Sequence, residues 1–183
     1  MNSTTRNEKI RFPGIQDGET FSIAGIEFIK FSDRNGETPI VAKDIVFNSR
    51  FGSDNDFRKS DVLKRLEIEF LPKIIETVGK ENLCAVKTDL TTMDGLKPYG
   101  VMESLISIPT MDFYRENVDI FDKHKVKSWW WLATAESALP HYEPYWVLCV
   151  SPSGRFSNGG YDFGNGVRPF LILKSSIFES FEA

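Results

Sequence analysis

The sequence is short of the residues that most often mark a disulfide framework, a metal site or a proton-transfer centre. Its 183 residues include only two cysteines and two histidines. Cys84 and Cys149 stand in apolar surroundings and have no partner at metal-ligand spacing, so we expect two reduced core thiols. His141 follows Pro140 and is expected to be a loop residue instead of a general base. The sequence therefore predicts no disulfide, no metal site and no bound cofactor.

Known catalytic and phosphate-binding motifs are missing as well. No G-x-S-x-G, Walker loop, H-E-x-x-H or EF-hand pattern occurs. The glycines between positions 159 and 166 precede a strand instead of a helix, so they lack the geometry that cradles phosphate. Asp89, Asp94 and Glu103 would hold Mg²⁺ only if the fold gathered them. We expect a protein without catalytic residues and keep a metal-dependent nuclease as an alternative.

Long apolar runs and an excess of basic residues are also absent. No apolar run approaches the roughly 20 residues that span a bilayer. Residues 1–9 are polar and lack the apolar core of a signal peptide. The formal net charge is -4, whereas dedicated nucleic-acid-binding domains are usually strongly basic. These features predict a cytoplasmic protein that does not enter membranes and binds free nucleic acid poorly.

What the chain does contain is a strongly apolar second half. Three segments of strand length are separated by loops rich in Pro, Gly, Ser and Asn: Trp129–Leu132, Tyr145–Val150 and Gly166–Leu173. The first two segments carry all four tryptophans. Because aromatic side chains bury the largest areas, we expect Trp131, Trp146 and Leu171 to share one buried core.

The first half alternates between strand and helix patterns. Strand-like runs occur at Thr20–Ile23, Ile26–Phe31 and Ile40–Phe47, with turns at Gly25 and Gly36. Ser60 is a suitable N-cap for a helix that Pro72 either ends or restarts, and Thr110 is a suitable N-cap for a short one. The segment 117–127 is charged and expected to be exposed. The prediction is a single α+β domain over residues 10–183, with small antiparallel sheets and one or two short helices, after a flexible tail at residues 1–9.

Several of these segments resemble a domain of unknown function that is common in phages, mobile elements and gut bacteria. The signature of that domain is W-W-L-R-S-P followed by G-V-R-P-A, and the matching residues are Trp130-Trp131-Leu132, Val150, Gly154 and Gly166-Val167-Arg168-Pro169. Upstream, the residues from Ser60 to Leu66 with Glu69-Phe70 are similar to its S-D-L-R-x-W-L-N-x-E-F segment, and Val101 to Tyr114 to its apolar strand-then-helix element. Ala133 and Ala135 replace the Arg and Pro after W-W-L. The resemblance covers most of the chain from about Thr20 and implies a C-type-lectin-like outline, with no assigned catalytic residue.

Two segments are candidates for partner binding. The first is the loop from Arg155 to Asn165, in which aromatic rings stand among small polar residues, a composition typical of binding loops. Its candidate residues are Arg155, Phe156, Asn158, Tyr161, Phe163 and Asn165, with Phe156 and Tyr161 as the expected anchors. The alternative is that these rings fold back onto the core. The second segment runs into the tryptophans and would steer a partner or its RNA through Lys123, His124, Lys125 and Lys127; its alternative is a solvated charged turn.

Arg168 is a charged residue inside an apolar run, between Val167 and Pro169. A charge in such a place needs a carboxylate or backbone carbonyls as partners. We therefore expect Arg168 to be structural and to fix the adjoining loop.

The resulting functional hypothesis is a non-catalytic binding protein of phage or mobile-element type, acting in the cytoplasm of a bacterial host. Its expected partner is a host or phage protein complex, with a ribonucleoprotein such as an RNA-guided CRISPR nuclease as one specific form, which would make the protein an anti-CRISPR inhibitor. A lectin-like module that binds a ligand or receptor on a phage or surface structure is the second hypothesis. Fold-level resemblance by itself does not decide between them.

Overall fold

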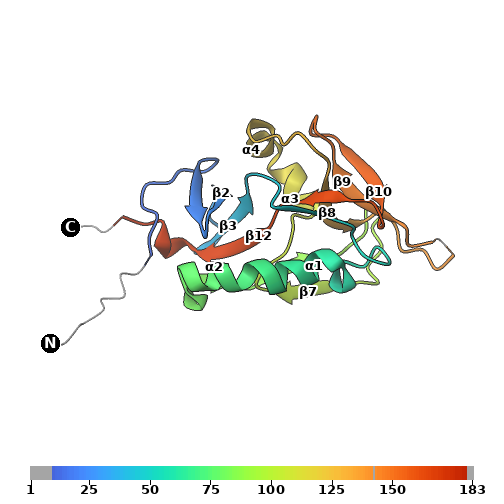
Figure 1. Ribbon diagram of the computed structural model, residues 1–183, viewed down its shortest axis with the longest axis horizontal. Coiled ribbons are helices and arrows are strands. Elements are labelled where there is room, and N and C mark those ends of the chain that lie inside the picture. The colour runs from blue at the N-terminus through green and yellow to red at the C-terminus, as the bar shows by residue number, and fades with distance from the viewer. Residues whose placement is uncertain (1–9, 142, 181–183) are drawn as a thin grey trace.

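The computed structural model describes residues 10–141 and 143–180, in which two five-stranded sheets lie between two sets of helices (Figure 1). Sheet A has the order β1 (Thr20–Ile23), β2 (Ile26–Lys30), β3 (Glu37–Ala42), β12 (Phe170–Lys174), β5 (Leu83–Cys84). Sheet B has the order β10 (Phe156–Gly160), β9 (Trp146–Val150), β8 (Trp130–Ala135), β11 (Asn165–Val167), β4 (Phe47–Ser49). A two-stranded ribbon pairs β6 (Val86–Asp89) with β7 (Val101–Ser104). Since β11 runs parallel to β8 and the other pairs are antiparallel, the predicted α+β class is confirmed, with one mixed sheet.

The two predicted turns near the N-terminus follow from local backbone chemistry. Ala24 and Gly25 connect β1 to β2 with φ values of 51° and 77°. Asn35 and Gly36 repeat the pattern at 58° and 83° before β3. Two consecutive residues with positive φ match the twist of a two-residue hairpin, and Asn and Gly tolerate that conformation best. Both turn predictions are confirmed.

A nearly continuous helical segment runs from Asp61 to Val78 along one side of the sheets. It comprises α1 (Asp61–Arg65), the π-helical turn η2 (Leu66–Phe70) and α2 (Leu71–Val78), preceded by the 3₁₀ turn η1 (Phe57–Lys59). The Ser60 side chain accepts the Leu63 N–H at 3.0 Å, as the N-cap prediction requires. Pro72 lies in the first turn of α2 and Gly79 is the C-cap of that helix, which confirms the alternative in which Pro72 opens a second helix. A proline ring clashes with the carbonyl four residues earlier, and the π-helical turn, in which Leu71 N–H reaches Leu66 O, changes the backbone at that place.

The short helices α3 (Met111–Glu116) and α4 (Val118–Lys123) cover the opposite side of the sheets (Figure 1). Thr110 caps α3 by accepting the Phe113 N–H at 3.2 Å, as predicted. The charged residues of segment 117–127 are exposed, as expected, but two apolar residues of the segment are not. Phe121 of α4 and Val126 after it are buried, because every third or fourth residue of this segment faces the sheets.

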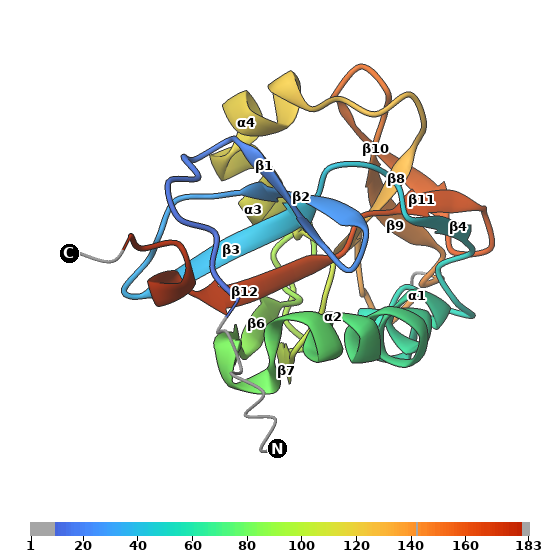
Figure 2. The same cartoon turned by 60° about the vertical axis from the view of Figure 1, so that its left-hand side comes forward.

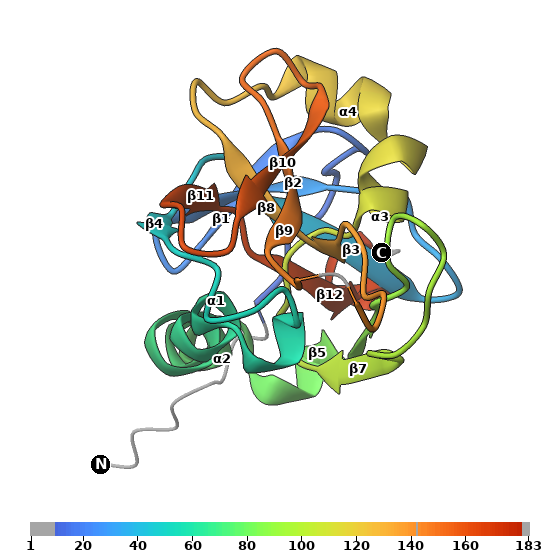
Figure 3. The same ribbon diagram turned by 90° about the vertical axis from the view of Figure 1, so that its right-hand side faces the viewer.

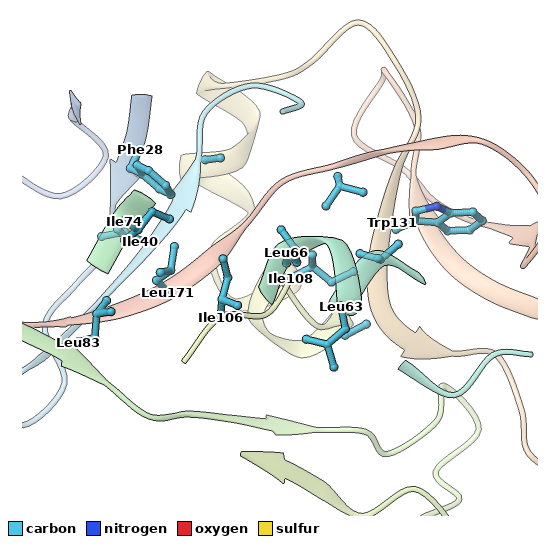
Figure 4. Close-up of a cluster of buried hydrophobic side chains, with 14 of the residues drawn as sticks. Phe28, Ile40, Leu63, Leu66, Ile74, Leu83, Ile106, Ile108, Trp131 and Leu171 are labelled. Carbon is cyan, nitrogen blue, oxygen red and sulfur yellow. The ribbon is translucent and has the colours of Figure 1, made fainter. Parts of the chain in front are cut away.

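The core consists of two clusters on opposite faces of the sheets. One cluster lies toward α1 and α2 and includes Trp131 and Leu171 (Figure 4). The other lies toward α3 and α4 and includes Trp130 and Phe121. Trp146 belongs to neither cluster and is only partly buried, so the prediction that it shares the core with Trp131 and Leu171 is wrong for this residue. Adjacent residues of a strand point to opposite faces of the sheet. A run of tryptophans therefore does not enter one common core, although its composition suggests that it does.

The chain changes sheets at Arg168 and Pro169. The segment Gly166–Leu173, expected to be one strand, is two: β11 in sheet B and β12 in sheet A (Figure 2). Arg168 Nε donates to Ala42 O at 2.9 Å, and Pro169 O accepts the Ala42 N–H at 2.8 Å. These bonds tie the crossover to the end of β3 and confirm that Arg168 pairs with a backbone carbonyl.

Candidate functional site

The segment from Arg155 to Asn165 is not the open loop that its composition predicts. Residues 156–160 form β10, the outermost strand of sheet B beside β9, and residues 161–164 turn the chain into β11. The glycines explain why this polar sequence forms a strand. A side chain at Gly159 would come within 3.1 Å of the Trp131 ring, and one at Gly160 within 2.3 Å of the Tyr145 ring. Gly within a strand commonly marks such a close approach.

The aromatic residues of this segment divide into surface and packing residues. Phe156 and Phe163 expose 43% and 52% of their surfaces. Tyr161 is partly buried, its ring centroid lies 5.0 Å from that of Tyr145, and its carbonyl accepts the N–H of Phe51 at 2.7 Å. Tyr161 therefore fixes the turn against the body of the protein, and Phe163 replaces it as the second exposed ring.

The polar candidates of the same segment have different surroundings. Asn158 is exposed, and its Nδ2 donates to Glu136 Oε1 at 2.5 Å. Asn165 is partly buried beside Gly159. Arg155 is exposed, and its backbone N–H donates to Ser151 Oγ at 3.1 Å. Arg155 is therefore the one charged residue of the three, and it is exposed.

The basic segment divides in the same way. Lys123, Lys125 and Lys127 are exposed, and Lys125 forms an ion pair of 2.5 Å with Asp122. His124 is partly buried, with its Nε2 2.8 Å from Gly18 O, a contact that ties the end of α4 to the N-terminal region. Of the four residues of this segment, the three lysines are thus the ones exposed at the surface.

The two candidate segments meet at the β9–β10 turn, Ser151–Arg155 (Figure 3). The Tyr114 hydroxyl donates to Gly154 O at 2.9 Å, and the Tyr114 ring centroid lies 5.3 Å from that of Phe156. Lys125 Cε lies 3.3 Å from the position that a Gly154 side chain would occupy. Lys125, Arg155 and Phe156 therefore surround one turn, and we call this surface the basic–aromatic patch.

A small cavity of about 10 Å³ lies beneath the patch, with Arg168 in its wall. Arg168 is 1% exposed, and its guanidinium carbon lies 4.8 Å from the Trp130 centroid and 5.3 Å from that of Phe121. Its Nη2 has no hydrogen-bond partner. Burial lowers the pKa of Arg168 to about 10, because the charged form is poorly solvated there.

Arg168 and Tyr114 are the residues of this region that sequence reasoning did not assign to a site. The signal for Arg168 was a charge inside an apolar run, but its missing partner is visible only in three dimensions. Nothing in the sequence around Tyr114 distinguished it from an ordinary core residue.

A second hollow, of about 200 Å³, lies between β6 and α3. Its wall mixes acids and bases, namely Arg34, Lys87, Asp89, Asp112 and Glu116. Across residues 10–141 and 143–180, no group of three or more His, Cys, Asp or Glu side chains gathers in a way that could hold a metal ion. The carboxylates of Asp89, Asp94 and Glu103 are thus not gathered into such a group.

Comparisons of the chain with protein families, with curated proteins and with solved structures find no match. Within the described part of the chain, none of the helices combines the length and the apolar character needed to cross a bilayer.

Proposed function

We propose that the protein is a non-catalytic intracellular binding protein that contacts a partner protein complex through the basic–aromatic patch. The observation that carries the proposal is the convergence of two segments thirty residues apart on one turn, where Lys125 lies beside Gly154 and Phe156 is 43% exposed. Exposed aromatic and arginine side chains are the residues most enriched at the centres of protein interfaces.

The residues of the patch would play different roles in binding, according to their chemistry. Phe156 would supply the apolar area that is desolvated on binding, and Arg155 would supply a charged hydrogen-bond donor at its side. Lys123, Lys125 and Lys127 would raise the rate of encounter with an acidic surface. Phe163 lies in the turn that follows β10, at the end of the strand away from Phe156, and would make a second contact with the partner there.

The specific form of this function rests on the resemblance to the phage and mobile-element domain. It favours a protein with a C-type-lectin-like outline that inhibits a host nucleic-acid-handling complex, such as an RNA-guided CRISPR nuclease. A net charge of -4 weakens attraction to free phosphate backbones, so the protein component of such a complex is the proposed contact.

The test is capture of partners from a bacterial host lysate with the tagged protein. A Phe156→Ala/Arg155→Ala variant is expected to lose more than tenfold of the captured partner, and a Lys123→Ala/Lys125→Ala/Lys127→Ala variant to lose less. Ile68→Ala is the matched control, because Ile68 is 76% exposed in η2, away from the patch. Unchanged capture by the Phe156/Arg155 variant, or equal loss in the Ile68 control, would refute the proposal.

A further inference from the structure

We propose that the cavity at Arg168 is a carboxylate site, which accepts one oxygen of an acidic side chain carried by the bound partner. This inference rests on the proposed function, since the partner that docks on the basic–aromatic patch supplies the acid. Lys125, Ser151 and Gly154 line the cavity together with Arg168, so its wall is continuous with the turn that the patch surrounds.

The first argument is the incomplete pairing of Arg168. Buried charges in proteins are normally paired and hydrogen-bonded, because an unpaired one loses its hydration without compensation. Here Nε is bound to Ala42 O and the rings of Trp130 and Phe121 lie against the guanidinium, but Nη2 is left without an acceptor. A carboxylate oxygen is the acceptor that a guanidinium binds most strongly.

The second argument is the size and lining of the cavity. A volume of about 10 Å³ accommodates one particle of the size of a water molecule or a single oxygen atom. It does not accommodate a whole phosphate group. The lining also includes Tyr114 and Ser151, but their hydroxyl groups are engaged with Gly154 O and Ser153 Oγ, which leaves Arg168 Nη2 as the donor without a partner.

The third argument is the balance of charge from the elements around the site. Lys125 and Arg168 both line the cavity. Two acids oppose them: Asp122 of α4 pairs with Lys125, and Asp44, after β3, acts on Arg168 at longer range. Among the described residues no carboxylate forms an ion pair with Arg168. An incoming carboxylate therefore competes with Asp122 for Lys125, whereas at Arg168 it meets only the longer-range charge of Asp44.

The experiment uses formate as the probe and reads the Arg168 Nε–H resonance by NMR in the full chain. We expect saturable binding of formate with a millimolar dissociation constant, and no comparable effect of inorganic phosphate at equal ionic strength. Asp122→Asn is expected to strengthen formate binding about threefold or more, and Lys125→Gln to weaken it by a similar factor. Both positions are exposed, so these variants test the site even if Arg168→Gln does not fold.

Several outcomes would overturn the inference. They are a linear, non-saturating formate response, an equal response to phosphate, or an Asp122→Asn variant that binds formate no better than the wild type. Partner capture that persists in a folded Arg168→Gln protein, while the Phe156→Ala/Arg155→Ala variant loses it, would also overturn it and leave the proposed function intact. Capture unaffected by the patch variant would overturn the proposed function, and with it the partner as the source of the acid, whatever formate does.

Discussion

Trp130 and Trp131 are neighbours in β8, yet their side chains enter different environments on opposite faces of sheet B. Trp131 packs edge-on against Phe51 at 5.5 Å, and its indole N–H donates to Ser49 O at 2.9 Å. Trp130 packs against Phe121 and against the guanidinium of Arg168. The same strand thus supplies one closed, fully bonded face and one face with a charge and a cavity.

The buried charges of the two sides show the same contrast. Next to the Trp131 side, Asp56 is 1% exposed, and its carboxylate accepts the backbone N–H of Arg58 at 3.1 Å and two bonds from the Arg58 side chain, at 2.8 and 2.7 Å. On the Trp130 side, Arg168 keeps Nη2 unpartnered. A saturated buried ion stabilises its loop, whereas an unsaturated one costs stability that binding can recover. The difference separates a face whose buried charge is fully paired from a face whose buried charge is not.

The largest effect should come from truncating the closed face. Trp131→Ala is expected to lower the free energy of unfolding by about 3–5 kcal/mol, because the ring is fully buried and its N–H is bonded. Chemical denaturation measures this loss. Trp146→Ala is the matched control, since Trp146 is only partly buried. Equal losses in the two variants would mean that the faces do not differ as described.

The next effect concerns Asp56. Burial raises the pKa of Asp56, but the hydrogen bonds from Arg58 outweigh it, and the net pKa is lowered from 3.8. A lowered pKa means stabilisation that is present above the unfolded value and is lost as the pH falls through the folded value. Asp56→Asn should therefore cost about 1.5–3 kcal/mol at pH 7.

The pH dependence of unfolding provides the check on Asp56. The difference in the free energy of unfolding between wild type and Asp56→Asn should become smaller as the pH falls below about 4, where the carboxylate becomes protonated. A gap that is constant from pH 7 to pH 3 would show that the substitution acts through packing instead of charge.

A smaller effect separates the two glycines of β10. Gly159→Ala presses on the buried Trp131 ring and should cost about 1–2 kcal/mol, the lower range for overpacking. Gly160→Ala meets the outer end of the Tyr145 ring, which is only partly buried and can swing aside, although the nominal approach is closer. Thermal unfolding should therefore give Gly159→Ala a lower melting temperature than Gly160→Ala. The reverse order would contradict the description of the Trp131 side as the closed face.

The smallest effect on stability is expected at the patch. Phe156→Ala and Phe163→Ala should each change the free energy of unfolding by less than about 0.5 kcal/mol, because each residue leaves about half of its surface exposed. A loss above about 1.5 kcal/mol in denaturant unfolding would show that these rings belong to the core, the alternative that the sequence left open.

The turns and helix caps could be predicted from the sequence, because each depends on a few neighbouring residues. The turns at Gly25 and Gly36 and the caps at Ser60 and Thr110 depend on a few neighbouring residues, and all four are present. The aromatic candidates were harder, because exposure depends on what lies across the strand. Tyr161 is covered by Tyr145 from sixteen residues away, whereas Phe163 is not.

Two features could not be predicted because they depend on the arrangement of whole sheets. The apolar run Gly166–Leu173 has no internal signal that β11 and β12 belong to different sheets, since a buried strand and a strand pair share the same composition. Arg168 Nη2 is unpaired because no acceptor lies next to it in the folded protein, and no local sequence pattern encodes that.

The crossover at Arg168 and Pro169 also has a consequence for biosynthesis. β11 lies between β8 and β4, and β12 between β3 and β5, so two strands that follow all the others in the described part of the chain occupy inner positions in both sheets. Neither sheet can close until residues 165–174 have left the exit tunnel. Until then the edges of β3 and β8 stay unpaired together, and both sheets close in a single step, when one short segment enters two sheets at once.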